Sequence, residues 1–360
     1  MAVISKLANV ASASVAKVID IAKASIEAVA GVLFSAPSTS VDVVVGHATS
    51  PYASAYPWSA GFGTKYSDPA TLPAGVGNGL CFSPDGADVA IAHSTTPYVS
   101  AYPWSAGFGT KYSNPGTLPA STGNEVHFSP DGADVAIAHN TNPFISTYPW
   151  SAGFGTKYSN PGSLPPGNCL GVSYSPDSAD IILGSNTSPY IVAYPWSAGF
   201  GTKYSNPGTT PTGVGRKLGF SPDGADVAIA HSTTPYVSAY PWSAGFGTKY
   251  SDAATTPTGT GSSAKFSSGV ELAIVHLNSP RITAYPWSSG FGTKFSNPGT
   301  ALASTGNDLT FTDSGDAIII AHTSSPYVSA YPWSGSGFGT KYSNPGTLPA
   351  GNGIGITINT

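Results

Sequence analysis

One triplet, Tyr-Pro-Trp, recurs seven times along this 360-residue chain and contains every one of its tryptophans. Successive copies lie 46, 46, 46, 46, 45 and 46 residues apart. A fixed period of this length is typical of one supersecondary unit copied along a chain. The fold must therefore be built from seven similar units, and departures from the repeat would mark any unique site.

Within one unit, the pattern predicts four short strands. Residues 125–128 alternate in polarity, and the Ser-Pro-Asp-Gly phrase at 129–132 has the signature of a type I turn. Residues 134–139 and 144–148 follow as the second and third strands, and the polar segment 155–159 as a fourth strand at an outer edge. Four strands in about 45 residues is typical of a propeller blade. The sequence therefore predicts an all-β fold, a seven-bladed β-propeller with four-stranded blades.

The two ends of the repeat array are complementary. Residues 41–47 match the second strand of a unit, at 88–93, and have no first strand before them. Residues 354–360 match a first strand alone. Because an open ring would leave two exposed sheet edges, we expect the C-terminal strand to complete the first blade and close the ring.

Composition argues against several classes of function. Charged residues make up 9% of the chain, against roughly 25% in a typical domain, and the net charge of -4 offers no basic surface to a phosphate backbone. We therefore expect no nucleic-acid partner. Cys81 and Cys169 occupy non-equivalent positions, which indicates neither a disulfide framework nor a zinc site. The sequence contains no run of 18 apolar residues, so we expect no membrane span. We also expect no cofactor and no metal.

The first 40 residues differ from the repeats. Apolar residues recur there at spacings of three and four, which is typical of a helix with one apolar stripe. We expect residues 1–34 to form an N-terminal α-helical arm, 35–40 a linker and 41–360 the propeller. Since such a helix is not stable alone, we interpret it as an anchoring or oligomerisation arm. The alternatives are a helix that packs against its own propeller and a segment that forms strands instead of a helix. The candidate anchoring residues are Ile4, Leu7, Val15, Val18, Ile26 and Val29.

The tryptophans have two interpretations. In the first, they fill the gap between neighbouring blades, because aromatic side chains bury large areas. Alternatively, they form a ring of aromatic faces that stack on sugars, with avidity raising the affinity of each weak site. The candidate ligand-binding residues are Trp58, Trp104, Trp150, Trp196, Trp242, Trp287 and Trp333.

The remaining polar residues form two rings and a small isolated group. Six equivalent histidines occur one to a blade, too far apart for a shared metal site, and we expect them to hydrogen-bond the adjacent turn. Seven lysines recur on the predicted outer strand, as a solvated edge or, alternatively, as an electrostatic contact for an acidic partner. Four basic residues lie outside this ring and the arm: Arg216, Lys217, Lys265 and Arg281. Two explanations remain for this group, a local asymmetric contact with a partner and sequence drift between the copies. Because an active site needs convergent, mostly unique residues, and nearly every polar type is replicated, we expect no catalytic residues and no enzyme.

The repeat phrases resemble those of known propeller proteins. Phe-Ser-Pro-Asp-Gly, at 82–86, 128–132 and 220–224, resembles WD40-type and related bacterial repeats, although the Gly-His and Trp-Asp dipeptides of WD40 units are absent. The longer phrase that begins Tyr-Pro-Trp-Ser-Ala-Gly-Phe-Gly resembles repeats of propeller proteins from tailed phages.

That second resemblance implies a non-enzymatic phage virion structural protein, a fibre or appendage at the virion surface and hence extracellular. Its arm would bind other virion proteins, its disc would bind the host surface or its glycans, and the protein would be a homo-oligomer. The alternatives are a purely structural capsid or tail decoration protein and a free multivalent propeller lectin.

Overall fold

The computed structural model describes residues 41–359, and every regular element in this range is a β-strand. The strands form seven antiparallel sheets. Sheet 1 contains β1 (Val41–His47), β2 (Ala53–Trp58) and β22 (Gly353–Asn359). Sheets 2 to 7 follow in chain order: β3 (Gly77–Phe82), β4 (Asp88–His93) and β5 (Val99–Pro103); β6 (Gly123–Phe128), β7 (Asp134–His139) and β8 (Ile145–Pro149); β9 (Cys169–Tyr174), β10 (Asp180–Ser185) and β11 (Ile191–Pro195); β12 (Gly215–Phe220), β13 (Asp226–His231) and β14 (Val237–Pro241); β15 (Gly261–Phe266), β16 (Glu271–His276) and β17 (Ile282–Pro286); β18 (Gly306–Phe311), β19 (Ala317–His322), β20 (Val328–Ser334) and β21 (Gly337–Phe338).

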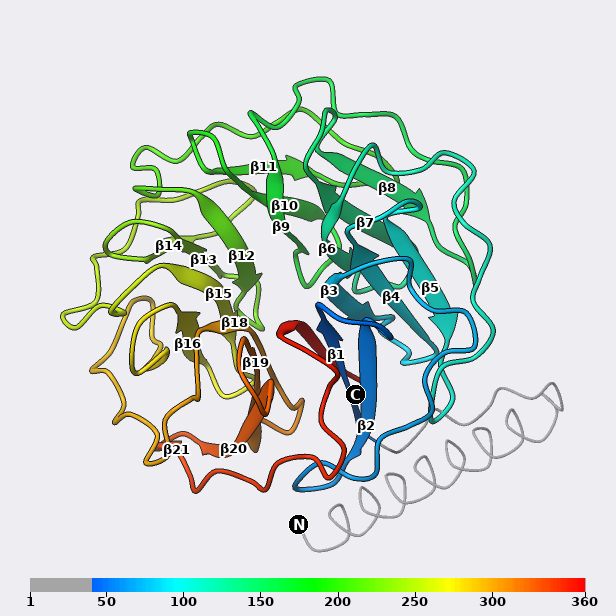
Figure 1. The fold of residues 1–360 in the computed structure, drawn as a ribbon. Coiled ribbons are helices and arrows are strands. Elements are labelled where there is room, and N and C mark those ends of the chain that lie inside the picture. The colour runs from blue at the N-terminus through cyan, green and yellow to red at the C-terminus, as the bar shows by residue number, and fades with distance from the viewer. Residues whose placement is uncertain (1–40, 360) are drawn as a thin grey trace, which may run out of the picture. The chain divides into compact units, whose positions relative to one another are not determined.

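The seven sheets stand around a common centre, and each contributes one inner strand to it (Figure 1). The inner strands are β22, β3, β6, β9, β12, β15 and β18. Each contacts the inner strands of both neighbouring sheets, and β18 contacts β22, so the circle is complete. In sheet 1, β1 pairs with β22 as well as β2, with Asp42 opposite Asn359 and Val45 opposite Ile356. The predicted closure by the C-terminal strand is confirmed.

The predicted fourth strand at 155–159 is not formed. Sheet 7 alone has a fourth strand, the two-residue β21, and in the other six sheets a single bridge joins the tryptophan to a phenylalanine four residues later. The chain turns sharply there, because Ala152 adopts the left-handed conformation with φ of 49°. Pro149 has no N–H to donate, and isolated bonds such as that from the Tyr158 N–H, at 3.0 Å, hold the next segment to the third strand. Four-stranded blades are therefore not shown.

A buried carboxylate at the start of the second strand links each of the first six sheets to the next, whereas Ala317 occupies this position in sheet 7. Asp88 accepts hydrogen bonds from the Tyr112 hydroxyl at 2.7 Å and from the Trp150 indole N–H at 3.0 Å. Tyr112 belongs to the same repeat as Asp88 and Trp150 to the following one. Trp150 also packs edge-to-face against Phe154, with ring centroids 5.1 Å apart. The same arrangement recurs around the ring, so the triplet that sets the sequence period is the joint between sheets.

The predicted helical arm at 1–34, with its six candidate anchoring residues, and the linker at 35–40 lie outside the described residues. Within residues 41–359, no helix is long and apolar enough to cross a membrane.

Candidate functional site

The near-identical repeats differ most along their inner strands. The first, fourth and sixth positions mostly keep a glycine, an aliphatic and an aromatic residue, whereas the second, third and fifth change in chemistry from sheet to sheet. From β22 through β3 and on to β18, the third position is occupied by Gly355, Gly79, Glu125, Gly171, Lys217, Ser263 and Asp308. Charged side chains that are unique to single repeats therefore converge on the centre of the ring.

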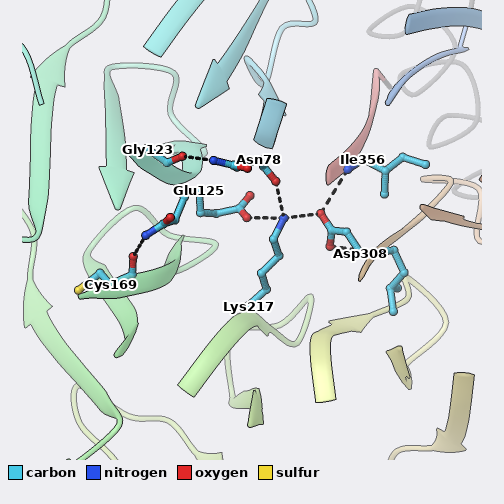
Figure 2. Close-up of polar contacts among 9 residues, drawn as sticks. Asn78, Gly123, Glu125, Cys169, Lys217, Asp308 and Ile356 are labelled. Carbon is cyan, nitrogen blue, oxygen red and sulfur yellow. Dashed lines mark hydrogen bonds and ion pairs between the residues drawn. The ribbon is translucent and has the colours of Figure 1, made fainter. Parts of the chain in front are cut away.

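Lys217, Glu125 and Asp308 form an ionic trio across this centre (Figure 2). Nζ of Lys217 lies 2.6 Å from Oε2 of Glu125 and 2.7 Å from Oδ2 of Asp308. The ammonium also donates to the backbone oxygen of Asn78 at 3.3 Å, and Oδ2 of Asp308 accepts the N–H of Ile356 at 3.2 Å. One lysine side chain thus joins the inner strands of sheets 2, 3, 5 and 7.

Small residues between the charged ones let the inner strands approach closely. A Cβ added at Gly79 would lie 2.5 Å from Cα of Glu125, and one added at Gly171 would lie 2.9 Å from Cα of Lys217. Side chains do not approach backbone atoms so closely, and glycine is the residue that permits it. Because small residues alternate with long charged ones at the third position of the inner strands, the side chains of the trio fill the middle of the channel.

Burial sets the protonation of the trio. It raises the pKa of Glu125 to about 7, against the opposing attraction of Lys217. Burial alone would lower the pKa of Lys217, but the carboxylates of Asp308 and Glu125 outweigh it and hold that pKa above its ordinary value. Lys217 is therefore a permanent cation, whereas Glu125 exchanges its proton near neutral pH, which suits a general acid or base.

A cavity lies on either side of the trio. The asparagine cavity, of about 340 Å³, is lined by the second position of every inner strand, which precedes the trio: Asn78, Asn124, Leu170, Arg216, Ser262, Asn307 and Ile354. The histidine cavity, of about 230 Å³, lies beyond the trio, and its lining includes Cys81, Glu125, His127, Lys265, Asp308 and Thr310. Each cavity holds a cation unique to one repeat, Arg216 in the first and Lys265 in the second.

The histidine cavity brings together an acid–base group, an acceptor and a cation. His127 donates its Nδ1–H to the carbonyl of Phe128 at 2.8 Å, which leaves Nε2 as an acceptor. Burial lowers the pKa of His127 to about 3, with Lys265 contributing, so the imidazole is neutral at pH 7. Lys265 makes no hydrogen bond or ion pair with any residue of the described range, and its ammonium is available to a ligand.

The predicted ligand-binding tryptophans are buried, with 4–8% of each residue exposed. Five of the seven indole N–H groups bond to an aspartate of the preceding sheet, and that of Trp333 lies 3.5 Å from Glu271, which is the geometry of the packing interpretation. A platform that stacks on a sugar needs an exposed aromatic face. Ligand binding by this ring stays a prediction that its burial does not favour.

The histidine ring makes its hydrogen bonds within single sheets. Nε2 of each ring member pairs with a serine or threonine hydroxyl seven residues later, at 2.9–3.0 Å. His47 also bonds the Thr49 carbonyl of the adjacent turn, as expected. Among residues 41–359, no group of three or more His, Cys, Asp or Glu side chains is placed to hold a metal ion. The ring lysines pair locally, as Lys203 does with Asn206 at 2.6 Å.

The sequence pointed to only part of this site. Arg216, Lys217 and Lys265, three of the four isolated cations, reach the central channel, whereas Arg281 bonds a backbone carbonyl outside it. The two carboxylates of the trio and His127 were missed. A signal for them exists, because the same strand positions hold glycine, serine or threonine in most other repeats.

The sequence matches no protein-family model and no curated protein. Solved structures share the fold across most of the chain. A periplasmic gluconolactonase from Pseudomonas aeruginosa superposes with a TM-score of 0.71 at 14% identity, covering 89% of this chain and 99% of that one. A candidate 6-phosphogluconolactonase from Bacteroides uniformis gives a TM-score of 0.68 at 14% identity, with the same coverage. A protein from Lactobacillus plantarum gives 0.72, again at 14% identity and covering 89% of this chain and 99% of that one.

These neighbours correct the functional predictions. The non-enzymatic phage virion protein, whether fibre, appendage or decoration protein, and the free lectin are wrong, because the neighbours are lactonase-like propellers and not phage proteins. The prediction that the protein is not an enzyme is overturned by the same finding. It relied on residues replicated in every repeat and overlooked the inner strands, where unique polar residues converge. The WD40 resemblance, the homo-oligomer and the extracellular location stay predictions.

Proposed function

We propose that the seven sheets are the blades of a seven-bladed propeller and that the protein is a hydrolase that opens a small lactone in the histidine cavity. One observation carries the proposal: Glu125, His127, Lys265 and Asp308, each unique to a single repeat, line one cavity in the channel. Convergent residues with perturbed pKa values in a cavity are what an active site requires. The fold shared with lactonase-like proteins supports the choice of a cyclic ester as substrate.

Glu125 is the proposed general base. Its Oε2 is held by Lys217, and Oε1 accepts no hydrogen bond from residues 41–359. With a pKa of about 7, its carboxylate can take a proton from water as the water oxygen bonds to the lactone carbonyl carbon. The ring C–O bond then breaks, and the same proton passes to the departing alkoxide. The product is an open-chain hydroxy acid, which ionises in solution.

Lys265 and His127 have supporting roles in this scheme. The unpaired Lys265 ammonium stabilises the negative charge that develops on the carbonyl oxygen. The neutral His127 accepts a hydrogen bond at Nε2 from a substrate hydroxyl and so orients the ring. The cavity volume of about 230 Å³ lies below the roughly 300–1,000 Å³ of drug-sized sites, which favours a substrate with a single ring.

The test is ring opening by the purified full chain, followed by alkali uptake at constant pH 6.5. Glucono-δ-lactone and 6-phosphogluconolactone are the substrates, and spontaneous hydrolysis is subtracted. We expect acceleration that Glu125→Gln lowers by at least a hundredfold and that Lys111→Gln, in the outer lysine ring, leaves unchanged. Hydrolysis no faster than the spontaneous rate with both lactones, from folded protein, would overturn the proposal.

A further inference from the structure

The strongest unexplained feature outside the proposed active site is the state of Arg216 in the asparagine cavity. Its guanidinium makes no hydrogen bond or ion pair with any residue between 41 and 359, and its Nε is buried without a partner. The other cation of the channel that faces this cavity, Lys217, is neutralised by two carboxylates. A half-buried charge without a counterion is costly unless a ligand supplies one.

Arg216 lies at a backbone bulge that recurs at this position in all seven inner strands, and its side chain lines the cavity. In β12, Gly215 pairs with His231 and Leu218 with Ile229, so two residues oppose one and the strand bulges at Arg216. Such bulges re-aim side chains, and they are frequent beside functional sites. Burial lowers the pKa of Arg216, and no acidic side chain opposes that effect. The guanidinium of Arg216 is therefore a cation whose N–H donors have no acceptor. Its planar arrangement of donors suits carboxylate and phosphate groups.

The amides around the cavity indicate what else the ligand carries. Asn78, Asn124 and Asn307 each donate Nδ2–H to a backbone carbonyl of the next sheet, at 2.8, 2.7 and 2.6 Å. Their Oδ1 atoms accept no hydrogen bond from the described residues and remain as acceptors. Acceptors in this position match hydroxyl groups, whereas Leu170 and Ile354 offer an apolar surface to a carbon chain.

We infer that the asparagine cavity is a second binding site, separate from the histidine cavity, for a small polyhydroxylated molecule that carries a carboxylate or phosphate group. Arg216 binds the oxyanion and the asparagine Oδ1 atoms accept the hydroxyls. The site does not depend on the proposed hydrolase activity, since the ionic trio stands between the two cavities.

Isothermal titration of the full chain at low salt tests the site. The probes are sodium gluconate, glucose 6-phosphate and neutral glucose, which separate carboxylate, phosphate and uncharged ligands. We expect one equivalent of at least one anion to bind and glucose not to bind. Arg216→Gln should weaken that binding at least tenfold, while Lys265→Gln, in the histidine cavity, should leave it within twofold.

A second variant keeps the test decisive if Arg216→Gln does not fold. Leu170→Asp places a carboxylate in the same cavity, where it should neutralise Arg216 and also abolish binding, and Arg216→Lys should restore only part of the affinity. Wild-type affinity in Arg216→Gln or in Leu170→Asp, loss in Lys265→Gln alone, or no binding of either anion to the wild-type protein would each overturn the inference.

Discussion

Acid should destabilise this protein through its ring of buried histidines, and the fourth repeat provides the means to test it. In that repeat, Ser185 stands where the others have histidine, and Val192 stands where they have its hydroxyl partner. All four side chains involved are buried in their own repeats. The double substitution His139→Ser and Ser146→Val therefore gives the third repeat the serine and valine that the fourth repeat has at these two positions.

The expected effect follows from the burial of His139. Burial lowers its pKa to about 4 from the ordinary 6.5. Because the folded state then binds the proton less tightly than the unfolded state, stability is lost as the pH falls below 6.5, and the loss is complete near pH 4. At pH 5, about 1.5 pH units below the ordinary pKa and at about 1.4 kcal/mol per unit, this histidine removes about 2 kcal/mol. At pH 7.5 it removes almost nothing.

Urea unfolding followed by tryptophan fluorescence, at pH 7.5 and at pH 5.0, measures this difference. On going from pH 7.5 to pH 5.0, the free energy of unfolding of the double variant should fall by about 2 kcal/mol less than that of the wild type, whatever the substitution costs at pH 7.5. Ser146→Val alone is the control, because it keeps the titrating histidine and should keep most of the acid sensitivity. Equal pH dependence in the wild type and the double variant would refute the reasoning.

Three further outcomes are expected. Lys217→Met should lower the free energy of unfolding by about 3–5 kcal/mol, because two carboxylates stay buried without their cation; adding Glu125→Gln and Asp308→Asn should recover most of the loss in urea unfolding, and no recovery would argue against the ionic cause. Trp150→Phe should cost about 1–3 kcal/mol in the same assay, because Asp88 loses its indole donor while the aromatic contact is largely kept; an unchanged midpoint would show that this bond contributes little. For lactone hydrolysis, kcat/KM should rise with pH and level off above about pH 7, because the Glu125 carboxylate is the active form; a flat profile would remove Glu125 from the role of base.

Much of the fold could be predicted from the sequence because the repeats carry the same information seven times. The period fixed the number of units, and the unmatched strands at residues 41–47 and 354–360 indicated ring closure, as the pairing of β1 with β22 confirms. The fourth strand that the same pattern predicted is not formed. The polar segment at 155–159 has a strand-like pattern, but the left-handed turn at Ala152 and the missing N–H of Pro149 prevent a continuous ladder.

The site was harder to predict because it depends on differences between repeats and on distant pairing. Asp308 lies 91 residues after Lys217 and Glu125 slightly farther before it in the sequence, so only the closed ring brings the three together. The sequence marked Lys217 as unusual among the cations. It gave no reason to connect it with two acidic residues, because glutamate and aspartate in a strand are ordinarily solvated.

The pairing of β1 with β22 has a consequence for synthesis on the ribosome. Sheet 1 cannot receive its inner strand until residues 353–359 have been translated, about 300 residues after β2 is complete. At roughly 5–20 residues per second, this interval lasts about 15–60 s. Throughout it, the Val-rich edge of β1 is unpaired, a state that invites association with other nascent chains. The nascent chain therefore has its greatest need of chaperones between the synthesis of β2 and that of β22, and pairing with β22 ends that exposure within the same molecule.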